Sequence, residues 1–259
     1  NAQTIKLPRM AVTGYKDHTR TPGFNAGTLS NDWEAKKLEH DRDVEFWIDP
    51  MDIEEYIKAH TDPEPELLQQ LGRDVHLRLL YPRMCSGHVQ GRLLKMLTAM
   101  VAPQRVLEIG TYAGYSALCI AEALPEGAHL DTVEIDDEME DFIRSRFGRS
   151  PHGHKITLHI GDFSRIAPSL QPGYDLAYMD ANKRTYTETF TLVRKLVRPG
   201  GFILADNTLW DGKVTDTTRH HDQQTLGIAE FNDTIAADPS LEKVILPLRD
   251  GLTLIRIKT

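Results

Sequence analysis

From residue 105 onward, short apolar runs alternate with longer segments in which apolar residues recur at helical spacing. The short runs are rich in branched side chains and several end at Gly, Asn or Asp, which is typical of buried strands. The longer segments have the length and period of helices. We expect strands at 105–110, 129–135, 156–161, 175–180, 201–207, 242–248 and 252–258, with helices near 115–124, 136–147, 185–197 and 222–237.

The order of these elements predicts the fold class. Alternating strands and helices form a parallel sheet with helices on both faces and right-handed crossovers. The last two strands are separated only by Arg249-Asp250-Gly251, which is a hairpin connection and makes one strand antiparallel. We therefore predict an α/β fold, with a Rossmann-like, mostly parallel sheet of seven strands that ends in a C-terminal antiparallel hairpin.

Helical patterns also precede the first strand and predict an N-terminal helical extension. A short helix is expected at 52–60, and a capping box at Thr61–Glu64 should open a second helix that reaches about Leu80. The second helix carries the four-residue stripe Leu67, Leu71, Val75 and Leu79, which is either core or a subunit interface. A third helix begins near Ser86-Gly87-His88, with Val89, Leu93, Leu97 and Val101 on one side.

Residues 1–45 have little apolar periodicity and are rich in polar side chains, so we expect an arm that is flexible or ordered only by a partner. The remaining chain is long enough for one sizeable core.

Composition narrows the classes of partner. The 259 residues carry a net charge of −8, which argues against nucleic acid or an anionic membrane as a partner. No apolar run approaches the ~20 residues of a membrane span. The two cysteines show no metal-ligand spacing, which fits a reducing compartment, and we expect a cytoplasmic protein.

The first strand leads into a glycine turn that indicates a cofactor site. Gly110 and Gly114 allow a sharp turn into a helix, and Glu108 lies at the carboxyl end of the strand, where open α/β sheets bind ligands. Tyr112 occupies the place where a dinucleotide site needs Gly to admit a pyrophosphate. An acidic loop suits a cation, so we expect the sulfonium and amino group of S-adenosylmethionine rather than NAD.

Acids after the second and third strands extend this site. Glu134 follows the turn by about twenty residues, where a carboxylate can accept both ribose hydroxyls. Asp162 follows the third strand, where it could meet the adenine amino group. For both residues the alternative is an acid that simply favours a helix N-terminus.

The fourth and fifth strands end in oxygen donors. Asp180 ends one strand, Asp206 and Asn207 end the next, and such ligands suit Mg²⁺, with Ca²⁺ or Mn²⁺ as alternatives. Without a cation, neighbouring carboxylates would repel each other. Lys183 follows Asp180 in the same loop and is a candidate base, because a nearby cation makes a lysine give up its proton more readily; the alternative is a solvated surface lysine.

Four segments together resemble the cation-dependent class I O-methyltransferases, the caffeoyl-CoA and catechol O-methyltransferase family. The resemblance runs from about Tyr81 to Thr259 and is carried by Leu107–Ser116, Met179–Lys183, Ala205–Gly212 and Leu246–Leu254. It implies a methyltransferase domain over 46–259 and a homodimer.

Carried over by position, the resemblance assigns roles to single residues. It implies a cofactor set, a metal set, a base at Lys183 and Trp210 at the border of the acceptor pocket. The cofactor set is Ser86 (through its backbone), Glu108, Gly110, Tyr112, Ser116, Glu134, Asp162 and Asp180; the metal set is Asp180, Asp206 and Asn207, with Asp180 also counted as catalytic.

The expected activity is divalent-metal-dependent transfer of a methyl group from S-adenosylmethionine to a hydroxyl of a small catechol-like acceptor. Residues 217–227 lack the tyrosines that help related plant enzymes hold a CoA ester, which argues against such a substrate. The alternatives are methylation of a hydroxylated tRNA base by the same fold, a nicotinamide-dependent reductase, and a non-catalytic cofactor-binding module.

Overall fold

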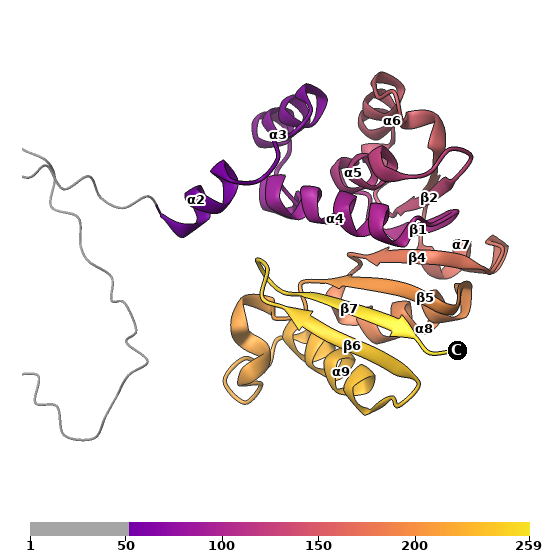
Figure 1. Cartoon of the computed structure of the whole chain (residues 1–259). Coiled ribbons are helices and arrows are strands. Elements are labelled where there is room, and N and C mark those ends of the chain that lie inside the picture. The colour runs from indigo at the N-terminus through magenta and orange to yellow at the C-terminus, as the bar shows by residue number, and fades with distance from the viewer. Residues whose placement is uncertain (1–51) are drawn as a thin grey trace, which may run out of the picture. The chain divides into compact units, whose positions relative to one another are not determined.

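A mixed seven-stranded sheet organises residues 52–259, which are the residues that the computed structural model describes (Figure 1). The strand order is β3-β2-β1-β4-β5-β7-β6; the first five are parallel, and β7 is antiparallel to both β5 and β6. The predicted fold class is confirmed. The strands are β1 (Arg105–Ile109), β2 (His129–Glu134), β3 (Ile156–Ile160), β4 (Tyr174–Met179), β5 (Val197–Asp206), β6 (Leu241–Leu246) and β7 (Leu252–Ile257).

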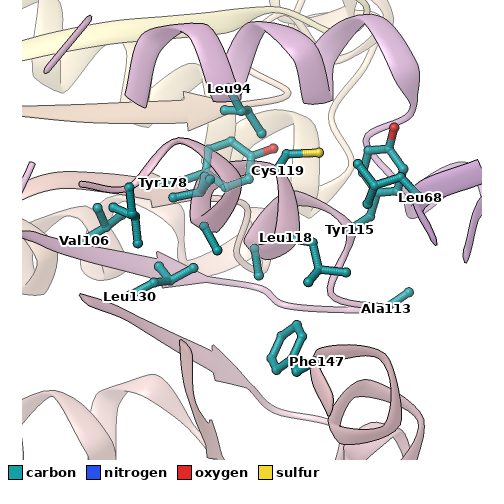
Figure 2. Close-up of a cluster of buried hydrophobic side chains, with 14 of the residues drawn as sticks. Leu68, Leu94, Val106, Ala113, Tyr115, Leu118, Cys119, Leu130, Phe147 and Tyr178 are labelled. Carbon is teal, nitrogen blue, oxygen red and sulfur yellow. The ribbon is translucent and has the colours of Figure 1, made fainter. Parts of the chain in front are cut away.

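Helices cover both faces of the sheet, because successive side chains of each central strand point to opposite sides. Val106 and Tyr178 belong to a core cluster with the helices of one face, which Figure 2 shows, whereas Leu107 and Met179 belong to a second cluster on the other face. The first cluster includes residues of α3 (Glu66–Arg78), α4 (His88–Val101), α5 (Tyr115–Ala123) and α6 (Glu140–Arg149); the second includes residues of α7 (Phe163–Ile166), α8 (Tyr186–Leu196) and α9 (Gln223–Ala237).

The expected N-terminal helices are present, but the predicted start of the second one is wrong. After α2 (Ile53–Ala59), α3 begins at Glu66 rather than at the capping box. The Thr61 hydroxyl instead donates to Ile57 O, and Glu64 accepts a hydrogen bond from the Tyr115 hydroxyl. Thr61 and Glu64, which the local pattern assigns to a helix cap, therefore form hydrogen bonds with the preceding helix and with Tyr115 instead.

The apolar stripe of α3 belongs to the core of this chain. Leu71 and Val75 are fully buried, while Leu67 and Leu79 are partly buried against the same cluster. The centre of the stripe, Leu71 and Val75, is therefore core rather than subunit interface.

The buried face of α4 differs from the predicted one by about one residue of rotation. Gln90, Leu94 and Thr98 are buried, whereas Val89, Leu93 and Leu97 are only partly buried. The innermost face of this helix therefore carries polar side chains, and one of them reaches the functional site.

Strand register places the carboxyl ends of the central strands side by side. Ile109 pairs with Met179, and Met179 pairs with Ala205. The residues that directly follow β1 and β4 and the residue that ends β5 therefore share one edge of the sheet.

Residues 52–259 form one compact unit, and within them no helix is both long and apolar enough to cross a bilayer. The expected arm at 1–45 and the start of the expected domain at 46–51 lie outside the described residues.

Candidate active site

A cavity of about 770 Å³ opens at the carboxyl edge of the sheet. Loops that follow all five parallel strands contribute to its walls, as the rule for open α/β sheets predicts. Nine of the residues singled out in the sequence line it: Ser86, Gly110, Tyr112, Glu134, Asp162, Asp180, Lys183, Asp206 and Asn207. Trp210 also lines it. A second, water-sized cavity of about 10 Å³ shares Ser86, Gly110, Tyr112 and Asp180 with it, and Ser116 lines this smaller space.

The glycine turn between β1 and α5 packs directly on the loop after β4. Gly110 has a φ of 96°, and a Cβ there would collide with the backbone carbonyl oxygen of Asp180. Only Gly satisfies both conditions at this position. The close approach puts the glycine turn and Asp180 in contact.

Tyr112 also takes a left-handed conformation, with a φ of 47°, which is uncommon for a residue with a side chain. Its N–H donates to Glu134 Oε2 at 2.6 Å, and the N–H of Asp136 donates to Glu134 Oε1 at 2.9 Å. The Glu134 carboxylate therefore joins the ends of β1 and β2 while lining the cavity.

Glu108 lies near the carboxyl end of β1, as predicted, but its side chain is turned away from the cavity. It is fully buried, lines neither cavity, and its Oε2 accepts a hydrogen bond from the Thr132 hydroxyl at 2.5 Å. Its Oε1 has no hydrogen-bond partner among the described residues. Burial raises the pKa of Glu108 to about 7, partly opposed by hydrogen bonds. The carboxyl group points into the interior, where the Thr132 hydroxyl of β2 donates to it. This contact ties the end of β1, which leads into the glycine turn, to β2.

Asp162 is the N-cap residue of α7, which is the alternative role that the sequence allowed for it. Its Oδ1 accepts a hydrogen bond from the Ser164 N–H at 2.8 Å, so it caps α7. This contact with Ser164 lowers the pKa of Asp162. Asp162 also lines the cavity, and therefore capping does not exclude a contact with adenine.

The loop after β4 pairs its two candidate residues with each other. Lys183 Nζ lies 2.6 Å from Asp180 Oδ1, and Lys183 is 7% exposed. The ammonium also lies 4.9 Å from the centre of the Tyr186 ring. The surface-lysine alternative is therefore wrong.

Asp206 is almost fully buried and accepts hydrogen bonds at both oxygens. Oδ2 accepts from Gln90 Nε2 at 2.5 Å and from the Tyr178 hydroxyl at 2.6 Å, and Oδ1 accepts from the N–H of Asn207 at 2.8 Å. Burial and then the Asp180 charge raise the pKa of Asp206. The two carboxylates thus repel each other across the ends of β4 and β5.

The Tyr186 hydroxyl fixes the spacing of these two strand ends. It lies 2.7 Å from both Met179 O and Asp206 O. Sequence reasoning missed Tyr186, Gln90, Tyr178 and Arg249, whose partners are distant in the chain. A helical projection centred on Leu94 would have placed Gln90 on the buried face of α4, and this is the one local signal.

The donor set fits a hard divalent cation. Two mutually repelling carboxylates and an amide oxygen are the ligand types that Mg²⁺ prefers, and a cation would relieve the repulsion. Within residues 52–259, no three His, Cys, Asp or Glu side chains gather at a potential metal site, so a cation here would depend on Asn207, water or substrate for further ligands.

Comparison with known proteins decides the family. Residues 58–258 match the model of a family described as O-methyltransferase. The chain belongs to the O-methyltransferase family. The resemblance seen in the sequence and the enzyme class, an S-adenosylmethionine-dependent O-methyltransferase, are confirmed.

Relatives of this O-methyltransferase span most of the described chain. Caffeoyl-CoA O-methyltransferase 2 of Zea mays is 33% identical over 204 residues, which cover 74% of this chain and 77% of the maize protein. A catechol O-methyltransferase of Niastella koreensis is 32% identical over 186 residues, covering 68% of this chain and 84% of that protein.

A solved structure agrees with the fold. The O-methyltransferase TomG of Streptomyces achromogenes, involved in tomaymycin synthesis and solved in complex with SAM, is 30% identical with a TM-score of 0.74. The match covers 79% of this chain and 95% of TomG.

Proposed function

We propose that this O-methyltransferase methylates one hydroxyl of a small catechol-like acceptor, using S-adenosylmethionine and a divalent cation held by Asp180, Asp206 and Asn207. The observation that carries the proposal is the meeting of Asp180, Asp206 and Lys183 at a cavity that the glycine turn also lines. Family membership argues against the nicotinamide-dependent reductase.

The cofactor would occupy the part of the cavity formed after β1, β2 and β3. TomG was solved with SAM, and the glycine turn of this chain contacts Asp180 directly. Glu134 would accept the ribose hydroxyls and Asp162 the adenine amino group, while Ser86, Gly110, Tyr112, Ser116 and Asp180 would surround the methionine end. The cofactor role expected for Glu108 becomes support of the turn from beneath.

The acceptor would occupy the part bordered by Trp210 and Asn207. Two relatives are named for caffeoyl-CoA and catechol, and catechol carries adjacent hydroxyls, which suits chelation by a site with few protein ligands. The composition and the resemblance remain the support for a homodimer and a cytoplasmic location.

The chain's own residues would perform positioning and proton transfer. A divalent cation supplies stabilisation of an acceptor oxyanion, and S-adenosylmethionine supplies the methyl group. Asp180 and Asp206 would orient the acceptor, and the neutral amine form of Lys183 would take the hydroxyl proton. The burial of Lys183 and Asp206 would keep water from competing. Holding the oxygen and the methyl carbon near ~3 Å accounts for most of the remaining acceleration.

Methyl transfer to 3,4-dihydroxybenzoate tests the proposal. We expect a singly methylated product by mass spectrometry with Mg²⁺, loss of product in excess EDTA, and recovery when Mg²⁺ is restored. Calorimetry with S-adenosylhomocysteine in EDTA is the control, since cofactor binding should survive chelation. Undiminished turnover in EDTA would reject the cation, and absence of product from a panel of catechols despite cofactor binding would reject the acceptor class.

A further inference from the structure

The side-chain amide of Gln90 lies between the guanidinium of Arg249 and the carboxylate of Asp206. Its Nε2 donates to Asp206 Oδ2 at 2.5 Å and to the Tyr178 hydroxyl oxygen at 3.0 Å. Its Oε1 accepts from Arg249 Nη1 at 3.1 Å. Gln90 comes from α4, Asp206 from the end of β5 and Arg249 from the β6–β7 turn, so three separate elements meet at one amide.

The partners determine which way the amide points. A guanidinium only donates hydrogen bonds and an ionised carboxylate only accepts them. The oxygen of Gln90 must therefore face Arg249, and its nitrogen must face Asp206. A neighbouring positive charge at the oxygen also polarises the amide and strengthens the hydrogen bond that its nitrogen donates.

Arg249 reaches further than Gln90. Its guanidinium donates to the backbone carbonyls of Cys85 at 3.1 Å, Arg83 at 3.3 Å and Ser86. Its backbone has a left-handed φ of 49°, an uncommon conformation for a residue other than Gly. The turn is thus held in a costly shape that delivers one side chain to both Gln90 and the segment 83–86, which lines the cavity.

These contacts leave the two oxygens of Asp206 unequal. Oδ2 already accepts from Gln90 and Tyr178, whereas the one donor to Oδ1 within residues 52–259 is the N–H of Asn207. Oδ1 is therefore the oxygen with free capacity toward a cation, and the side chain is held against rotation by its other oxygen.

We propose that Arg249 and Gln90 form a relay that orients Asp206 for cation binding and links it to the cofactor-lining segment 83–86. Both are positioning residues, and the proposal rests on the proposed function. Residues that hydrogen-bond to metal ligands orient them, and their loss costs about 10- to 100-fold in metal affinity.

Gln90→Met is the main test, because methionine keeps the approximate shape of glutamine and removes all three of its side-chain hydrogen bonds. We expect Mn²⁺ affinity, measured by electron paramagnetic resonance on the cofactor-free protein, to fall about 10- to 100-fold. Calorimetry should show S-adenosylhomocysteine affinity in EDTA changed by less than about twofold. In turnover assays the Mg²⁺ concentration for half-maximal rate should rise, with less effect on kcat at saturating Mg²⁺.

Thr98→Val is the matched control. Thr98 is buried on the same face of α4, but its hydroxyl donates only to Leu94 O within the helix. Mn²⁺ affinity should therefore equal that of the unaltered protein. An equal loss in Thr98→Val and Gln90→Met would assign the effect to helix packing and overturn the relay.

Arg249→Met closes a double-mutant cycle. Alone it should weaken both Mn²⁺ and S-adenosylhomocysteine binding; added to Gln90→Met it should lower Mn²⁺ affinity by less than about twofold further, since the relay is already broken. Full additivity for Mn²⁺ would contradict the relay. Should Gln90→Met fail to fold, Arg249→Met alone decides, because unchanged Mn²⁺ affinity there overturns the proposal.

The two proposals fail separately in these experiments. If the unaltered protein binds no Mn²⁺, the metal-dependent function is rejected. If it binds Mn²⁺ and Gln90→Met binds it equally well, the function stands and the relay is rejected.

Discussion

Glu134 and Asp206 end two strands of the same sheet and are equally buried, at 7% and 5% exposed, yet they are held by different kinds of donor. Glu134 accepts from two backbone N–H groups, those of Tyr112 and Asp136. Asp206 relies at Oδ2 on the side chains of Gln90 and Tyr178. Backbone donors are fixed as soon as the strands pair, whereas side-chain donors depend on contacts from distant elements.

The same contrast separates two halves of the cavity. The proposed cofactor half, after β1 to β3, contains Glu134 and Asp162, which accept hydrogen bonds from nearby backbone N–H groups. The proposed cation half, after β4 and β5, contains Asp180 and Asp206. Burial and then the Asp180 charge raise the pKa of Asp206, and Lys183 is the close counter-charge of Asp180. In the proposed function, a ligand would therefore relieve more charge repulsion in the cation half than in the cofactor half.

The sharpest way to break this contrast is Asp206→Asn. The change keeps the shape of the side chain and removes a charged ligand, so we expect methyl transfer to fall by about 10³-fold, the equivalent of several kcal/mol of charge stabilisation. Steady-state kinetics measures the loss, and S-adenosylhomocysteine calorimetry in EDTA should change by less than about threefold. A comparable loss of cofactor affinity would mean that the halves are not independent.

A second expectation concerns Glu108 beneath the cofactor half. Its pKa is about 7 in the folded protein and near 4.5 unfolded, so the folded state binds the proton more tightly. Stability from this group is complete below about pH 4.5 and is lost as pH rises through about 7, by an amount on the order of 3 kcal/mol. Urea unfolding from pH 5 to pH 8 should show this decline, and Glu108→Gln should flatten it. An unchanged slope in the variant would assign the pH dependence to other groups.

The smallest expected effect is that of Glu134→Ala. Losing a charged acceptor for the ribose hydroxyls should lower S-adenosylhomocysteine affinity by about 10- to 30-fold, as expected for one charged hydrogen-bonding group. Mn²⁺ affinity should stay the same, and calorimetry with each ligand measures both values. Weaker Mn²⁺ binding in this variant would show that the acid after β2 also supports the cation half.

Local pattern predicted the sheet well because each strand is an apolar run bounded by turn residues. The hairpin at Arg249–Gly251 followed from the short connection between the last two strands. The meeting of Asp180 and Asp206 followed from the strand order, since parallel strands share their carboxyl edge. The start of α3 was mispredicted, because the contact between Glu64 and Tyr115 outweighs local preference. The burial of Glu108 against Thr132 was not predicted either, because no local pattern relates these two residues.

The relay was invisible in the sequence for a related reason. Gln90 lies 116 residues from Asp206 and 159 from Arg249, so no local period relates them. Polar residues such as Gln90 and Thr98 on the buried face of α4 also interrupt the apolar stripe by which such a face is recognised.

The contact between Gly110 and the Asp180 carbonyl has a consequence for reaction geometry. The backbone of Gly110 packs against the backbone of Asp180. The separation between the turn after β1 and the loop after β4 is therefore set by the peptide backbone and not by a side-chain rotamer. In the proposed enzyme, changes in the loop that carries Trp210 would reshape the acceptor pocket without moving this backbone contact.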